Sequence, residues 1–100
     1  MLEKQIEKYL IDSVNKILKG TAYKFTSPGR RAVPDRICVV NGYCFFVECK
    51  ATDKFLTMSQ QREADRLIEL DQWVYMVNSK SSINNLISFW ERKLKEEGRL

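Results

Sequence analysis

The feature that most constrains the fold of this chain is an Asn-Gly pair at positions 41 and 42, which separates two apolar runs. Residues 36–40 and 43–50 have the composition of β-strands, and Asn-Gly between such runs is the strongest short signal for a two-residue hairpin of type I′. Both faces of this hairpin carry apolar side chains, Ile37, Val39 and Phe46 on one and Val40, Phe45 and Val47 on the other. We therefore expect other elements to cover both faces and the hairpin to lie centrally in its sheet.

The remaining segments predict three helices and two further strands. Apolar residues recur at helical spacing over 2–19, with Gly20 as the expected stop, and helical patterns return over 57–70 and 83–95. Residues 21–26 and 73–77 are rich in strand-forming types, and Pro28 and Gly29 interrupt the chain between the first two strands. The order α-β-β-β-α-β-α predicts an α/β fold with a central mixed sheet flanked by helices on both faces.

Composition limits the chemistry that the chain can perform. One hundred residues predict a single domain spanning 1–100, and the absence of a long apolar run or signal peptide predicts a soluble, cytoplasmic protein without membrane contact. Cys38, Cys44 and Cys49 lie in apolar stretches, odd in number and without zinc-site spacing, so we expect buried, reduced thiols. There is no histidine, which excludes catalysis by a histidine base. Catalysis would therefore have to use carboxylates, lysine and a hard, oxygen-binding cation.

The predicted hairpin brings two acids together. If Asn41 and Gly42 form the loop, Val40 pairs with Tyr43, and stepping outward along both strands places Asp35 opposite Glu48. Opposed like charges destabilise a sheet, but a divalent cation shared by both carboxylates removes the conflict. Lys50 follows Glu48 by two residues and therefore shares its face. Two acids and a lysine around one cation are suited to phosphodiester hydrolysis.

The motifs around these residues resemble a known nuclease family. Val33-Pro34-Asp35-Arg36, followed after the hairpin by Phe46-Val47-Glu48-Cys49-Lys50, resembles the PD-(D/E)xK nuclease signature, and its details are similar to the VRR-NUC branch, the virus-type replication and repair nucleases. Residues 3–7, 27–30 and 56–60 also match that branch, so the similarity covers nearly the whole chain. Ala32 and Asp71 depart from it, because the family usually has Gly at the first position and often at the second.

The resemblance implies a restriction-endonuclease-like core and a role for each matched residue. Asp35, Glu48 and the backbone carbonyl of Cys49 would hold Mg²⁺ or Mn²⁺, and Lys50 would be the catalytic lysine. An acid of the first helix would complete the shell; Glu3 and Glu7 are one turn apart, and we favour Glu7 as the more central. Gln60 would support the site from the next helix, although Thr57-x-x-Gln60 is also a capping box that would start that helix without any catalytic role.

A basic loop lies next to the predicted acids. The net charge is +4, and residues 21–50 carry five Lys or Arg against two acids, whereas residues 51–80 have a net charge of −1. A solvated face would explain such a cluster, but a Pro-Gly loop beside a metal site is also where a phosphate backbone would pass. The predicted DNA contacts are Lys24, Ser27, Arg30, Arg31 and Arg36.

These features together predict a Mg²⁺- or Mn²⁺-dependent deoxyribonuclease that recognises DNA shape rather than sequence. The resemblance implies branched DNA such as four-way junctions as the substrate, and a phage or bacterial source. Two symmetrical cuts in a junction need two sites, so we expect a homodimer, with an interface near Phe89 and Trp90, which we expect not to share one core. The alternative is a non-catalytic DNA-binding or protein-interaction module of the same fold, which would leave the opposed acids without a purpose.

Overall fold

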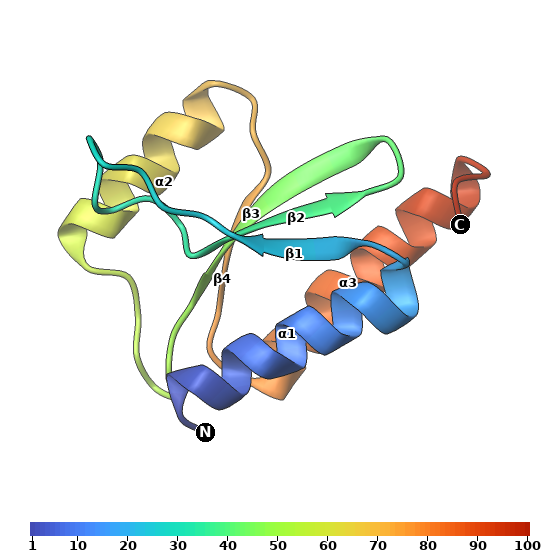
Figure 1. The fold of residues 1–100 in the computed structure, drawn as a ribbon, viewed down its shortest axis with the longest axis horizontal. Helices are drawn as coiled ribbons and strands as arrows, with labels where there is room; N and C mark the ends of the chain where they lie inside the picture. Colours follow the sequence, from blue (N-terminus) through green and yellow to red (C-terminus); the bar gives the residue numbers. More distant parts are fainter.

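The computed structural model, which describes residues 1–100, has the predicted order of elements (Figure 1). Four strands form one mixed sheet in the order β1-β2-β3-β4, in which β1, β2 and β3 are antiparallel neighbours and β4 runs parallel to β3. The elements are α1 (Glu3–Leu18), β1 (Thr21–Lys24), β2 (Arg36–Val40), β3 (Tyr43–Cys49), α2 (Met58–Glu69), β4 (Val74–Val77) and α3 (Lys80–Glu96). None of the helices is both long and apolar enough to span a membrane.

The central position and the register of the hairpin are confirmed. β2 and β3 are the two inner strands, and their paired residues run from Val40 with Tyr43 to Arg36 with Val47, as stepping outward from the Asn-Gly pair requires. Because neighbouring residues of a strand point to opposite faces, this register decides which side chains meet α1 and α3 and which meet α2.

The main core lies between the sheet and the adjacent helices α1 and α3 (Figure 1). The indole of Trp90 stacks on the ring of Phe45, with centroids 4.7 Å apart and planes 13° from parallel, and its N–H donates to the Tyr75 hydroxyl at 3.2 Å. Phe89 is half-buried and contacts Trp90 edge-on at 5.6 Å. Our expectation that Phe89 and Trp90 could not share one core was wrong, because Trp90 is fully buried and Phe89 packs against the same cluster.

The second face of the sheet is covered only in part. Two residues expected to be buried, Val39 and Cys44, are exposed, Val39 to 41%. The short helix α2 packs against β4 and leaves the outer half of the hairpin open (Figure 1). The expectations of full coverage and of three buried thiols were therefore wrong at these residues, whereas Cys38 and Cys49 are buried and all three thiols are free.

The hairpin turn differs from the predicted type. Gly42 has a φ of 89°, but Asn41 does not have a positive φ, so the turn is not type I′, which requires positive φ at both positions. The C-terminal segment explains the difference, because the Arg99 guanidinium covers Gly42 and the Asn41 amide donates to the Arg99 carbonyl at 3.1 Å. A Cβ at Gly42 would meet only the end of the Arg99 side chain, which can move aside, so the positive φ is what favours glycine there.

The helix ends also differ from the sequence pattern. Lys19, and not Gly20, takes the left-handed conformation that ends α1, with a φ of 56°. Gly20 is instead needed for close approach to β2, because a Cβ there would collide with the Val39 carbonyl. α3 begins at Lys80, three residues before the predicted start at 83, because Ser79 accepts from the Ser82 N–H and caps the helix.

Candidate active site

Asp35 and Glu48 lie just beyond Arg36 and Val47, the last paired residues of β2 and β3. The Asp35 N–H donates to Oε1 of Glu48 at 2.9 Å, and the Cys49 N–H donates to Oδ2 of Asp35 at 3.0 Å. Each carboxylate thus accepts a bond from the backbone of the opposite strand. These bonds hold the two acids side by side, in agreement with the pairing derived from the hairpin register.

The environment of Glu48 disfavours its charge. Its side chain is nearly buried, and burial first, then the charge of Asp35, raises the Glu48 pKa to about 7. The Lys50 ammonium, 3.8 Å from Oε2 of Glu48, opposes this shift. Asp35 itself has no lysine or arginine partner within ion-pair distance. Lys50 thus balances Glu48 in part, whereas Asp35 has no cationic partner, so the pair keeps an excess of negative charge.

Lys50 is placed beside Glu48 without being bound tightly to it. Its backbone N–H donates to the Val77 carbonyl at 2.9 Å, which fixes the end of β3 against β4. Its side chain is 14% exposed, and the 3.8 Å distance to Glu48 is longer than a hydrogen bond. The ammonium therefore lies near the acids with donors available for another acceptor.

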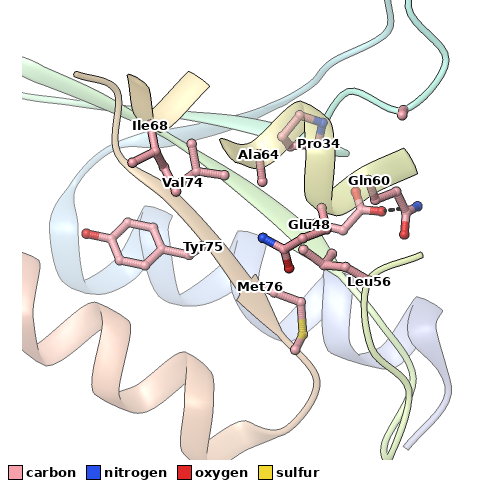
Figure 2. A pocket seen from close by; sticks show the side chains of 11 residues that line it. Pro34, Glu48, Leu56, Gln60, Ala64, Ile68, Val74, Tyr75 and Met76 are labelled. Atoms are coloured by element: carbon pink, nitrogen blue, oxygen red, sulfur yellow. Dashed lines mark hydrogen bonds between the residues drawn. The ribbon is translucent and has the colours of Figure 1, made fainter. Parts of the chain in front are cut away.

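Gln60 makes the contacts that both of its predicted roles would require. Its side-chain carbonyl accepts from the Thr57 N–H at 3.0 Å, and its own N–H donates to the Thr57 hydroxyl at 3.2 Å, which forms the capping box of α2. Its side-chain NH₂ group donates to Oε2 of Glu48 at 2.7 Å (Figure 2). The capping geometry fixes the amide carbonyl and thereby aims the NH₂ group at Glu48.

Glu7 faces the sheet, and Arg36 holds it there. Nε of Arg36 lies 2.9 Å from Oε2 of Glu7, and Nη1 of Arg36 donates to the Ala22 carbonyl at 3.3 Å. Glu3 is exposed, so the two acids that spacing could not separate differ in position. The Arg36 side chain is only 17% exposed, so this predicted DNA contact is engaged inside the protein.

The charges of three acids affect the Cys49 thiol. After burial, the charges of Asp35, Glu7 and, more weakly, Glu48 raise the pKa of the Cys49 thiol above its usual range. Acids of α1, of β3 and of the segment before β2 thus act on one thiol.

The residues present fit a small divalent cation. No three acidic or cysteine side chains are arranged as a ready-made shell, so Asp35 and Glu48 supply a pair of carboxylates rather than a cage. Mg²⁺ is commonly held by one or two carboxylates, with waters and substrate phosphates filling the other positions. The unbalanced charge of Asp35 and Glu48 matches that donor set.

Three of the predicted DNA contacts lie beside Asp35. Lys24, Ser27 and Arg31 line a hollow of about 290 Å³ together with Asp35, so three of the predicted DNA contacts gather at the predicted metal ligand. Arg30 is directed elsewhere, because its Nη1 lies 3.2 Å from Oε1 of Glu63.

Glu63 was not identified from the sequence. Its carboxylate is nearly buried on α2, pairs with Arg30 and lies 3.7 Å from Nε of Arg66. Its position three residues after Gln60, on the same helix face, was the available signal. Through Arg30 it ties the basic loop to α2.

An apolar pocket adjoins Glu48. It has a volume of about 180 Å³ and lies between α2 and the β3-β4 half of the sheet, with Glu48 and Gln60 in its lining (Figure 2). The buried residues of α2 are only Glu63 and Ala64, and a small residue such as Ala64 leaves this space open. Its apolar lining includes Pro34, Leu56, Ala64, Ile68, Val74 and Met76.

Comparison with known proteins agrees with this geometry. No family model matches the sequence. A protein named "Putative nuclease p44", from Acyrthosiphon pisum secondary endosymbiont phage 1, is 49% identical over 79 residues, which are 78% of this chain and 84% of that protein. A solved structure named VRR_NUC domain is similar with a TM-score of 0.79 and 27% identity, over 86% of this chain and 94% of that one. The shared fold and the closely related phage protein show that this chain belongs to the VRR-NUC family of nucleases.

Proposed function

We propose that this protein is a metal-dependent nuclease that hydrolyses phosphodiester bonds of DNA. The observation that carries the proposal is the pair Asp35 and Glu48, hydrogen-bonded to each other's strands with Lys50 beside them. A protein gains no stability from two opposed acids, so the pair needs another reason to be there. Membership of the VRR-NUC family supports the same conclusion.

Asp35, Glu48 and the backbone carbonyl of Cys49 would hold Mg²⁺ or Mn²⁺. Such an ion, when bound, would polarise the scissile phosphate and lower the pKa of a bound water. Gln60 and the Asp35 N–H each donate to one oxygen of Glu48, so its carboxylate is oriented in advance. We assign Glu7 as the further acid of this shell, held in place by Arg36.

Lys50 is the residue of this chain best placed to act on the reacting groups. Its ammonium can donate to the attacking water or to a phosphate oxygen on which charge develops. Burial to 14% exposure strengthens such a contact, because water screens it less.

Lys24, Ser27 and Arg31 are the proposed contacts to the DNA backbone, since they line the hollow that contains Asp35. Arg30 contributes by holding the loop to Glu63, from which it can also reach a phosphate by a change of side-chain conformation. Contacts of this kind position a nucleic acid without reading its bases. We therefore propose recognition of DNA shape, on branched substrates such as four-way junctions, in the cytoplasm of a phage host.

We further propose that the protein works as a homodimer, because a junction needs two symmetrical cuts. The best candidate interface is a groove of about 600 Å³ along β4 and α3. β4 is an edge strand, and Ile68 and Trp73 beside it are 52% and 40% exposed. Phe89 lines the same groove, which makes it apolar along most of its length. An edge strand with an exposed apolar border is suited to a self-complementary contact.

Replacing Lys50 by alanine should abolish cleavage and leave the fold intact. We expect a loss of at least about a hundredfold in turnover on nicked, flapped and four-way DNA with Mn²⁺, because the donor to the reacting oxygens is removed. Lys54→Ala, which removes an exposed lysine four residues away, is the control and should cleave normally. Normal turnover of Lys50→Ala with unchanged circular dichroism would show that the active site lies elsewhere.

Asp35→Asn should stabilise the metal-free protein by up to about 1 kcal/mol, because it removes the repulsion between two opposed acids. The asparagine carbonyl can still accept the Cys49 N–H. Melting is measured in EDTA and again with Mn²⁺, which should stabilise the wild type and not the variant. Asp65→Asn, at an exposed position of α2, is the control. A lower melting temperature of Asp35→Asn in EDTA would contradict the repulsion.

Replacing both Lys24 and Arg31 by alanine should weaken DNA binding and make its salt dependence shallower, by up to about two units in the slope of log affinity against log salt. Cleavage of saturating substrate should continue. The charge-matched control is Lys16→Ala with Arg92→Ala, on the two helices that cover the opposite face of the sheet. Equal slopes for the two double variants would assign Lys24 and Arg31 to an ordinary solvated surface.

The wild-type protein should sediment as a dimer at micromolar concentration, and Ile68→Asp should convert it to a monomer by placing a charge in the groove. Ile17→Asp is the matched control, because Ile17 is 42% exposed on α1, outside the groove. A wild type that remains monomeric at every concentration would refute the dimer and leave the nuclease proposal standing.

A further inference from the structure

The sheet face that carries Asp35 and Glu48 continues into an open apolar surface. Tyr23 is 59% and Val39 41% exposed, and Ile37 and Phe46 are half-buried beside them. We refer to Tyr23, Ile37, Val39 and Phe46 as the outer face. It occupies the part of β1, β2 and β3 that α2 leaves uncovered (Figure 1).

The outer face and the acids lie on the same side of the sheet. Tyr23 pairs with Ile37, and Ile37 pairs with Phe46, so these three side chains form one row across the strands. Asp35 precedes Ile37 by two residues and Glu48 follows Phe46 by two. Since alternate residues share a face, the row lies about 6 to 7 Å along the strands from the acids.

Phe25 connects the row to the active site. Its N–H donates to the Asp35 carbonyl at 2.8 Å, so the pairing of β1 with β2 continues as far as the acid. Its ring lies 5.8 Å from that of Phe46 and is inclined by 48°. Phe25 also lines the hollow that contains Asp35 and Arg31. A path of aromatic side chains therefore leads from the acids to Tyr23.

The charges along this path suit an anion. The strands β1, β2 and β3 contain three charged residues, of which Arg36 and Glu48 are largely buried and only Lys24 is exposed. Arg31 adds a second exposed cation at the hollow. Lys24 and Arg31 both line the hollow, so a polyanion meets two cations where this path begins, and the row from Phe46 to Tyr23 carries no charge.

These observations favour a single-stranded nucleic acid over other occupants. Exposed rings bordered by cations bind unpaired strands, because every base can stack on a ring while the cations follow the backbone. A duplex keeps its bases stacked inside and cannot use the rings. A second copy of this chain already has a proposed place along β4, at the opposite edge of the sheet from β1.

We propose that the outer face binds unpaired nucleotides next to the cleavage point, with a base stacked on Tyr23. This inference rests on the proposed nuclease function and narrows its branched substrates to those that have a single-stranded arm or gap next to the branch point. The arm leaves the acids past Phe25, and Lys24 contacts its backbone.

The test compares the binding of two labelled DNAs in EDTA, a duplex with a single-stranded arm and a fully paired duplex of equal length. Tyr23→Ala should weaken binding of the arm-bearing DNA about five- to a hundredfold, the range for loss of one stacked base, and leave the paired duplex unchanged. Tyr23→Phe keeps the ring and should bind as the wild type does. Tyr23→Leu keeps apolar bulk without a ring and should bind as Tyr23→Ala does, which preserves the test if the alanine variant fails to fold.

Ile17→Ala, which removes a comparably exposed apolar side chain from α1, is the control and should change neither affinity. Equal losses on both DNAs, or no loss for Tyr23→Ala and Tyr23→Leu, would overturn the proposal. Conversion of a dimer to a monomer by Tyr23→Ala would also overturn it, because it would assign the outer face to a second copy. Cleavage is not needed for this measurement, so failure of the nuclease proposal and failure of this one are distinguishable.

Discussion

The opposition of Asp35 and Glu48 is the constraint on which the rest of the site depends. Two carboxylates at the ends of neighbouring strands repel, and burial makes the charge of Glu48 costlier still, as its raised pKa of about 7 shows. The surrounding groups hold both acids in place despite this cost. Two backbone N–H groups and the Gln60 amide donate to their oxygens. These neutral donors orient the acids without neutralising them, which is the arrangement that the proposed cation site requires.

The sequence predicted this pairing because a two-residue Asn-Gly loop fixes the register of β2 against β3 from the turn outward. The turn type could not be predicted in the same way, because Arg99, more than fifty residues away, packs on Gly42 and its carbonyl binds Asn41. The exposure of Val39 and Cys44 depends likewise on the length and placement of α2. Local pattern therefore determined the elements, and contacts distant in sequence determined which surfaces stayed open.

The same distinction applies to the candidate site. Asp35, Glu48 and Lys50 follow from strand alternation, and the capping role of Gln60 follows from its spacing to Thr57. The contact of Gln60 with Glu48 depends on where the chain carries α2, and the pair of Glu7 with Arg36 depends on how α1 crosses the sheet. Neither placement is encoded in a short motif. Arg36 shows the consequence, since its charge suggested DNA contact and its position in β2 directs it into the protein.

The two faces of the sheet contribute differently to the stability of the fold, and the candidate site lies on the face that contributes less. The side facing α1 and α3 holds almost all the fully buried side chains, including the stack of Phe45 on Trp90, and change there would open cavities. The other side is covered by one helix whose only buried residues are Glu63 and Ala64. Stability therefore constrains that side least. That side carries Asp35 and Glu48, the exposed ring of Tyr23 and the exposed Arg31, and the proposed DNA substrate would account for all of them.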